Sequence, residues 1–156
     1  GTRLQSFITT ALPEYEAEGS VAAGVDIQFK SKDGRLKYCQ LKAGPLTINS
    51  KDVQPIKDEY RSVLNLARTN NLDIINTDLF IGVFYGERSQ LSANYKALEE
   101  DYEVMIGDEF WKFLTRRDDL YPRMIKTIEE LTEKFDFTNE IKVLENRLTD
   151  ELKHHL

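Results

Sequence analysis

Residues 24–42, GVDIQFKSKDGRLKYCQLK, form the most informative stretch of the sequence. Apolar and polar side chains alternate in its first half, and the alternation returns after a turn-forming Asp-Gly pair. Period-2 alternation is typical of strands with one buried face. The stretch therefore predicts a β-hairpin, and the apolar residues expected to face the core are Val25, Ile27, Phe29, Cys39 and Leu41.

The length of the hairpin loop decides which polar residues face one another. A two-residue Asp-Gly turn would set Asp26 opposite a core residue. A three-residue loop over residues 32–34, with Gly34 in the left-handed conformation, sets Asp26 opposite Gln40 instead. Lys42 then projects from the same face. We expect the longer loop, because a one-residue slip would move every side chain to the opposite face.

The spacing of these three polar residues is similar to a known sequence signature. Asp26-x13-Gln40-x-Lys42 resembles the PD-(D/E)XK nuclease signature, with Gln in place of the second acidic residue. QLKAGPLTINSKDV, from residue 40, and GDEFWKFLTRRDDLYPRMI, from residue 107, are similar to type II restriction endonucleases of that superfamily. The resemblance covers roughly residues 24–128. It implies a restriction-endonuclease-like fold and a place in a restriction-modification system.

That resemblance also implies a reaction, the hydrolysis of phosphodiester bonds of double-stranded DNA with Mg²⁺ as cofactor. The implied catalytic residues are Asp26, Gln40 and Lys42. Asp26, Gln40 and the main-chain carbonyl of Leu41 supply oxygen ligands to Mg²⁺, which prefers them. Lys42 acts on the attacking water or on the transition-state charge.

Gln40 departs from the family pattern, and the departure leaves three possibilities open. A carboxamide carries no charge, so it holds a cation more weakly than a carboxylate does. The site is then an active variant, a site helped by an upstream Glu, or a degenerate site that binds without cutting. Many relatives carry an additional Glu on the helix before the hairpin. Glu14 or Glu16 is the corresponding metal ligand here, and solvated surface glutamates are the alternative.

A DNA-contacting segment is expected where a long helix begins. Asn49, Ser50 and Lys51 lie at the predicted N-terminus of that helix, where main-chain N–H groups favour a phosphate. The alternative role is helix capping, and both roles can hold together. Trp111 is expected in the core rather than stacked on bases.

A single nuclease-like domain over residues 1–156 follows from length and pattern. We expect an N-terminal helical segment (1–23), a core (24–138) and a C-terminal helix (139–156). The fold class is α/β, with a mixed central sheet that contains the catalytic hairpin and is flanked by helices. Its most apolar strand is expected within residues 77–86, buried on both faces.

The composition of the chain indicates its binding partner and its cellular compartment. The net charge is −6, yet residues 24–70 hold nine Lys/Arg against five Asp/Glu. We expect this basic segment to face DNA, with chance as the alternative. A lone Cys39 and the lack of an apolar run approaching the ~18 residues of a membrane span favour the cytoplasm. The resemblance to restriction enzymes implies that the cell is a bacterium or archaeon.

The resemblance also implies an assembly and leaves rival functions open. We expect a homodimer, because a restriction enzyme cuts both strands of a symmetric site. One candidate interface is an apolar stripe on the last helix, and packing of this stripe on its own domain is the favoured alternative; the stripe consists of Ile141, Leu144, Leu148 and Leu152. The rival functions are a repair or junction-cleaving nuclease of the same fold and a catalytically degenerate DNA-binding or interaction module.

Overall fold

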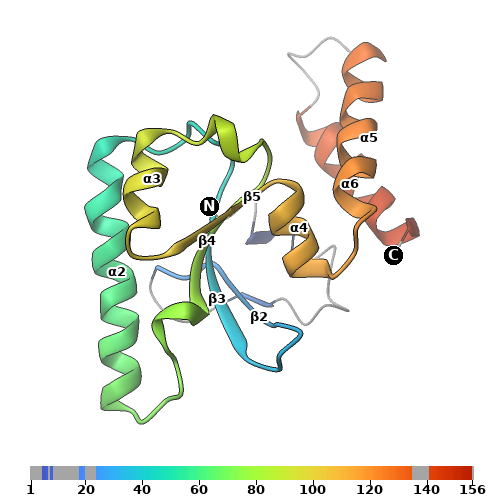
Figure 1. The fold of residues 1–156 in the computed structure, drawn as a ribbon. Helices are drawn as coiled ribbons and strands as arrows, with labels where there is room; N and C mark the ends of the chain where they lie inside the picture. Colours follow the sequence, from blue (N-terminus) through green and yellow to red (C-terminus); the bar gives the residue numbers. More distant parts are fainter. Residues whose placement is uncertain (1–4, 7, 9–17, 20–23, 135–140, 156) are drawn as a thin grey trace.

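The computed structural model describes residues 5–6, 8, 18–19, 24–134 and 141–155. Its centre is a mixed β-sheet with helices on both faces (Figure 1). The strands follow the order of the chain across the sheet: β1 (Glu18–Gly19), β2 (Ile27–Lys30), β3 (Leu36–Lys42), β4 (Leu79–Val83) and β5 (Glu103–Ile106). β1, β2 and β3 are antiparallel neighbours, whereas β3, β4 and β5 are parallel. The predicted α/β class, with a hairpin in a mixed sheet, is confirmed.

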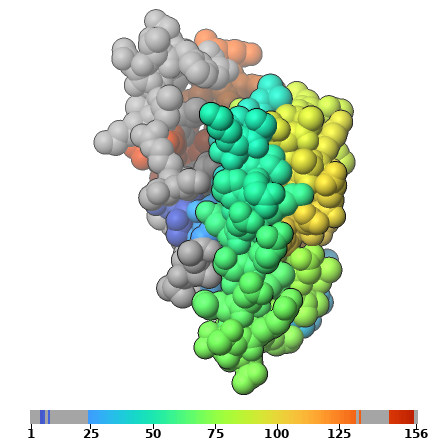
Figure 2. All heavy atoms as spheres, turned by 90° about the vertical axis from the view of Figure 1, so that its left-hand side faces the viewer, coloured from blue at the N-terminus to red at the C-terminus, as the bar shows by residue number. Residues whose placement is uncertain are grey.

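Different helices lie on the two faces of the sheet. The described helices are α2 (Ser50–Thr69), α3 (Ala93–Glu99), α4 (Asp108–Thr115), α5 (Leu120–Lys134) and α6 (Ile141–His155), with two short 3-10 helices, η2 (Asn76–Asp78) and η3 (Arg88–Gln90). α2 and α3 lie on one side of the sheet and α4 on the other, with α5 and α6 paired beyond it (Figure 1). Figure 2 shows α2 running lengthwise over its face of the molecule, with α3 beside it.

Two apolar clusters fill the two sides of the sheet. On the α4 side, Phe29 and Leu41 pack with Trp111, which is fully buried as predicted. On the α2 side, Tyr60 packs with Ile81 of β4. All five residues of β4 are buried, and they contribute to both clusters, so the prediction of a central strand covered on both faces is confirmed.

The hairpin adopts the predicted three-residue loop but slips at its open end. Ile27 pairs with Cys39 and Lys30 with Leu36, and Gly34 has φ +83°. The N–H of Asp26 then donates to the carbonyl of Cys39 (2.9 Å), so Asp26 and Ile27 both oppose Cys39. Two residues facing one are a β-bulge. The expected pairing of Asp26 with Gln40 is therefore wrong.

The bulge also changes the face on which Val25 lies. Val25 was expected to share the core face of Ile27, but it packs in the cluster on the α2 side, with Ile56. Ile27 remains in the cluster on the α4 side. An extra residue in one strand reverses the alternation beyond it, because successive side chains point to opposite faces.

The ends of the chain are described in part. Within the expected N-terminal helix, residues 5, 6 and 8 are helical and Ile8 is buried. Glu14 and Glu16 lie outside the described residues. On α6, Leu148 and Leu152 are buried within the chain itself, and Leu152 belongs to the cluster on the α4 side. These two leucines therefore pack on their own domain and offer no dimer surface.

Candidate active site

The bulged end of the hairpin and the first half of α2 enclose a pocket of about 340 Å³. The three residues expected to be catalytic all line it, although they do not pair as the sequence predicts. Two further acids come from α2. The polar and charged lining residues are Asp26, Gln40, Lys42, Asp52 and Glu59.

Asp26 is held against β3 by its own side chain. Its Oδ2 accepts a hydrogen bond from the N–H of Leu41 (2.7 Å). The bulge makes this contact possible, because the strand backbone leaves the regular ladder at Asp26 while the carboxylate reaches back to it. Asp26 is half-buried, so its carboxylate borders the pocket and the sheet together.

Gln40 is the most buried polar residue of the pocket, at 6% exposure. Its Nε2 donates to the carbonyl of Gly24 and to Oε2 of Glu59, both at 2.8 Å. Both neighbours are acceptors, so the amide nitrogen must face them and the oxygen must face the other way. Within the described part of the chain, Oε1 of Gln40 is buried and has no hydrogen-bond partner.

The main chain of Gln40 is tied to α2 by Tyr60. The N–H of Gln40 donates to the Tyr60 hydroxyl (2.8 Å), and that hydroxyl donates in turn to the carbonyl of Phe80. Tyr60 is fully buried, and burial raises the pKa of its hydroxyl well above the usual value, so it remains a donor. The Tyr60 hydroxyl therefore connects α2 with β3 and β4 directly at Gln40.

Glu59 is the site residue that the sequence reasoning missed. It precedes Tyr60, so it lies at the border of the buried face of α2, beside the hairpin. Gly24 gives it room: a Cβ on Gly24 would lie 2.6 Å from Cβ of Glu59 and 2.8 Å from its Oε2. Gly24 also has φ +82°, a conformation that other residues rarely adopt. A glycine directly before the first hairpin strand was the available signal.

The segment expected to contact DNA forms the cap of α2. Asn49 is the N-cap: its side chain accepts from the N–H of Lys51 (2.8 Å), and the Asp52 carboxylate accepts from the N–H of Asn49 (2.7 Å). The capping role is therefore observed, and these two N–H groups already have acceptors. Asn49, Ser50 and Lys51 are exposed, which leaves their side chains accessible.

Ion pairs engage part of the basic segment. Arg35 and Lys37 both contact the buried carboxylate of Asp78, at 2.6 and 3.2 Å. Lys57 contacts Asp101 at 2.7 Å. Asp78 and Asp101 belong to residues 71–156, which hold nineteen Asp/Glu against eleven Lys/Arg. The positive excess of residues 24–70 is therefore not a continuous free surface.

The oxygen atoms around the pocket fit a hard cation. Among the described residues, no three His, Cys, Asp or Glu side chains gather into a metal-binding group. The pocket instead offers carboxylates and one amide oxygen, the ligands that Mg²⁺ and Ca²⁺ prefer. A buried amide oxygen without a partner costs about 1–3 kcal/mol, and a bound cation would satisfy Oε1 of Gln40.

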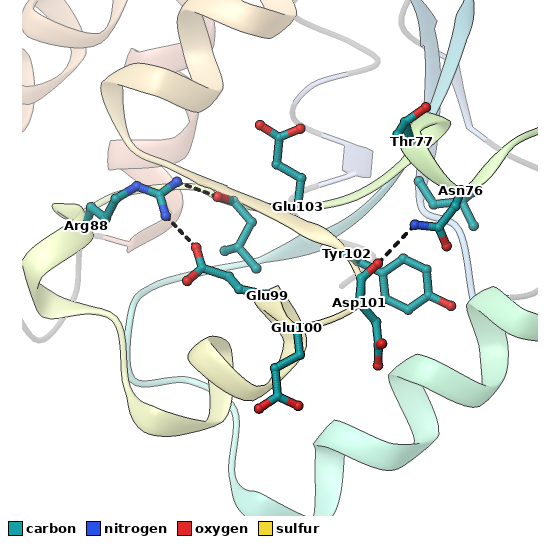
Figure 3. Close-up of a pocket in the computed structure, with 10 residues that line it drawn as sticks. Asn76, Thr77, Arg88, Glu99, Glu100, Asp101, Tyr102 and Glu103 are labelled. Atoms are coloured by element: carbon teal, nitrogen blue, oxygen red, sulfur yellow. Dashed lines mark hydrogen bonds and ion pairs between the residues drawn. The ribbon is translucent and has the colours of Figure 1, made fainter.

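A second pocket, of about 500 Å³, lies beside the edge strand β5 and also has an acidic lining (Figure 3). Arg88 donates to Glu99 and to the carbonyl of Val104 (2.6 Å), and Asn76 donates to the carbonyl of Asp101 (3.0 Å). Its acidic lining residues are Glu99, Glu100, Asp101 and Glu103. None of the three residues of the family pattern, Asp26, Gln40 and Lys42, lines this second pocket, so it is not the candidate active site.

Comparison with protein families gives one match of wide extent. The family described as "Type II restriction endonuclease EcoO109I" matches residues 3–136, most of the chain. A comparison with curated proteins finds no match. In the described ranges, none of the helices is long and apolar enough to cross a membrane.

Proposed function

The chain belongs to the type II restriction endonuclease EcoO109I family, and on that premise we propose that Asp26, Gln40 and Lys42 form its catalytic centre. Membership makes the chain an endonuclease of double-stranded DNA, a phosphodiester hydrolase. Enzymes of this kind typically use divalent metal ions. We assign Mg²⁺ to the pocket between β3 and α2, within a domain that spans residues 1–156.

One observation carries the assignment. The three residues of the family pattern line one pocket, and in the described part of the chain Gln40 turns a buried, unpartnered oxygen away from its two hydrogen-bond acceptors. Asp26, Gln40 and the carbonyl of Leu41 would hold Mg²⁺. When bound, the ion neutralises charge on the phosphate and lowers the pKa of a water.

The side chains have separate tasks in this reaction. Asp26 supplies the anionic oxygen, and its hydrogen bond from Leu41 keeps the carboxylate oriented. Lys42 supplies an ammonium that stabilises negative charge developing on the phosphate. A lysine is not a ligand for a hard cation, so its removal separates chemistry from metal binding.

DNA reaches the site along the start of α2 in this proposal. Ser50 and Lys51 are exposed next to the pocket, while Asn49 holds the helix cap. The side chains rather than the capped N–H groups contact phosphates. We further propose that the enzyme acts as a homodimer in the cytoplasm of a bacterium or archaeon, as part of a restriction-modification system.

The decisive experiment is cleavage of mixed plasmid and phage DNA by the wild-type chain with Mg²⁺, Mn²⁺ or EDTA. Metal-dependent fragments of defined length are expected, and Lys42→Ala abolishes them. A smear of random lengths would favour a repair-type nuclease. DNA that is bound but uncut under all three conditions would support the rival function, a degenerate DNA-binding module.

A further inference from the structure

The pocket contains two carboxylates that the family pattern does not use: Asp52 accepts from the N–H of Asn49 in the cap of α2, and Glu59 contacts Gln40. Oε2 of Glu59 lies 2.8 Å from Nε2 of Gln40, the residue that stands where the family pattern has an acid. We infer that Glu59, from α2, supplies the second negative charge of the metal site, and that Gln40, bonded to Glu59 through Nε2, contributes its neutral oxygen. This inference rests on the proposed function, since it names a further residue of the same site.

The amide of Gln40 favours this division of tasks. Its nitrogen is fixed by two acceptors, Gly24 and Glu59, and its oxygen faces away from both. That oxygen is buried and, as far as the described residues extend, without a hydrogen-bond partner. A glutamate at this position would instead meet the carbonyl of Gly24 with a negative oxygen. The surroundings therefore suit an amide at 40 and a carboxylate at 59.

Gly24 is the third part of the arrangement. Its carbonyl accepts from Gln40, while the space where its Cβ would lie is filled by Glu59, with Oε2 only 2.8 Å from that point. Any larger residue would clash with the Glu59 side chain and would also strain the backbone at φ +82°. The absence of a side chain at Gly24 therefore leaves room for the carboxylate of Glu59 beside the pocket.

The negative charge of Glu59 is expected to raise the affinity of the site for a divalent cation. A neutral carboxamide donates an oxygen but no charge, so a site with Asp26 and Gln40 alone has one negative ligand. Affinity for a divalent cation depends on the charge count of the ligands. Glu59 brings the count to two, the number that the family pattern reaches with an acid on the strand.

The test compares Mn²⁺ binding by the full-length wild type, Asp26→Asn and Glu59→Gln, with free Mn²⁺ measured by electron paramagnetic resonance. Residues that merely orient a ligand cost about 10–100-fold in metal affinity when removed, so Glu59→Gln should weaken binding by at least about tenfold. Its amide oxygen still accepts from Gln40, so the fold and its melting temperature in EDTA should be close to those of wild type. Glu130→Gln, on the exposed face of α5, is the matched loss of one charge.

A double variant distinguishes charge from position. Gln40→Glu combined with Glu59→Gln keeps the net charge and the donor-acceptor pair but moves the carboxylate to the strand. We expect it to bind Mn²⁺ more tightly than Glu59→Gln alone, although its melting temperature in EDTA should fall because the carbonyl of Gly24 loses its donor.

The outcomes separate the inference from the proposed function. Wild-type affinity in Glu59→Gln, together with loss in Asp26→Asn, would overturn the role of Glu59 and leave the metal site at Asp26 intact. No binding by the wild type, with or without double-stranded DNA, would overturn both. Parallel losses in Asp26→Asn and Glu59→Gln, with Glu130→Gln unchanged, would support both.

Discussion

The carboxylate of Asp26 accepts a hydrogen bond from the main-chain N–H of Leu41 at 2.7 Å, across a bulge in the hairpin. The Asp26 side chain thus bonds to the main chain of β3 and also lines the pocket. Replacing it changes two things at once, the charge of the site and the fit of β2 on β3.

Asp26→Ala and Asp26→Asn are expected to differ in stability but not in metal binding. Both remove the charge, so neither should show the Mg²⁺-dependent rise in melting temperature expected of wild type. Alanine also removes the acceptor for Leu41, which costs about 1–2 kcal/mol, whereas asparagine keeps an oxygen. Urea denaturation in EDTA measures the difference. Equal stabilities would mean that the contact contributes nothing to folding.

Lys42→Ala is expected to separate cleavage from metal binding. Loss of the ammonium should reduce the cleavage rate by about 10²-fold or more, because charge developing on the phosphate is no longer stabilised. Its Mg²⁺ response in thermal melts should equal that of wild type. Lys51→Ala is the comparison at the start of α2, and it should weaken DNA binding at low salt while the rate at saturating DNA stays within a few-fold. A Lys42→Ala enzyme that cuts normally would remove Lys42 from the catalytic centre.

Tyr60→Phe is expected to destabilise the chain without changing its apolar packing. The hydroxyl bridges the N–H of Gln40 and the carbonyl of Phe80, and both are buried, so their loss costs about 1–3 kcal/mol. Tyr102→Phe is the control: its ring packs edge-on against Tyr60 with centroids 5.0 Å apart, and that contact survives the change. Urea denaturation of both variants should show a larger loss for Tyr60→Phe.

Asp78 is expected to make the fold sensitive to acid. Burial raises its pKa, but hydrogen bonds from Arg35, the N–H of Ile75 and Lys37 outweigh burial and lower the pKa to about 2, from the usual 3.8. Because the folded-state pKa is the lower one, the stabilisation is complete above about pH 4 and disappears as the pH falls towards 2. The difference corresponds to about 2 kcal/mol.

Asp78→Asn should therefore lose about 2 kcal/mol at pH 7 and show a flatter stability profile between pH 4 and 2. Asp73→Asn is its matched control, since Asp73 contacts the same Arg35 but its side chain is 82% exposed, where an ion pair contributes little. Denaturant titrations from pH 2 to 7 give both profiles. An unchanged pH slope in Asp78→Asn would contradict the assignment.

The protein is expected to be a homodimer in solution. Light scattering with and without cognate DNA should give about twice the 18.1 kDa of one chain. Leu148 and Leu152 are buried within the chain, so substitutions at these positions should lower stability rather than release monomers. A mass of one chain, also on DNA, would contradict the proposed dimer.

The sequence predicted those parts of the site that depend on neighbours along the chain. The three-residue loop followed from alternation and from Gly34, and the buried strand β4 followed from its apolar run. Both are local patterns with a fixed period. The family pattern named Asp26, Gln40 and Lys42, which do line one pocket.

What the sequence did not predict depends on contacts between distant segments. The bulge at Asp26 comes with a contact between its carboxylate and the N–H of Leu41, fifteen residues along the chain, and no periodicity in the sequence predicts such a contact. Glu59 enters the pocket only when Tyr60 has docked α2 on the sheet. The resemblance indicates an upstream acid, Glu14 or Glu16, because a resemblance transfers positions and not contacts.

The close approach of Gly24 to Glu59 has an evolutionary consequence. If the carboxylate has moved from strand to helix in this lineage, three positions of the family should vary together. Relatives with an acid at the position of Gln40 have no need of one at 59, and they can accept a side chain at 24. Relatives with an amide at 40 should keep both the glycine and the helical acid, so the triplet is a genetic signature by which such enzymes can be recognised.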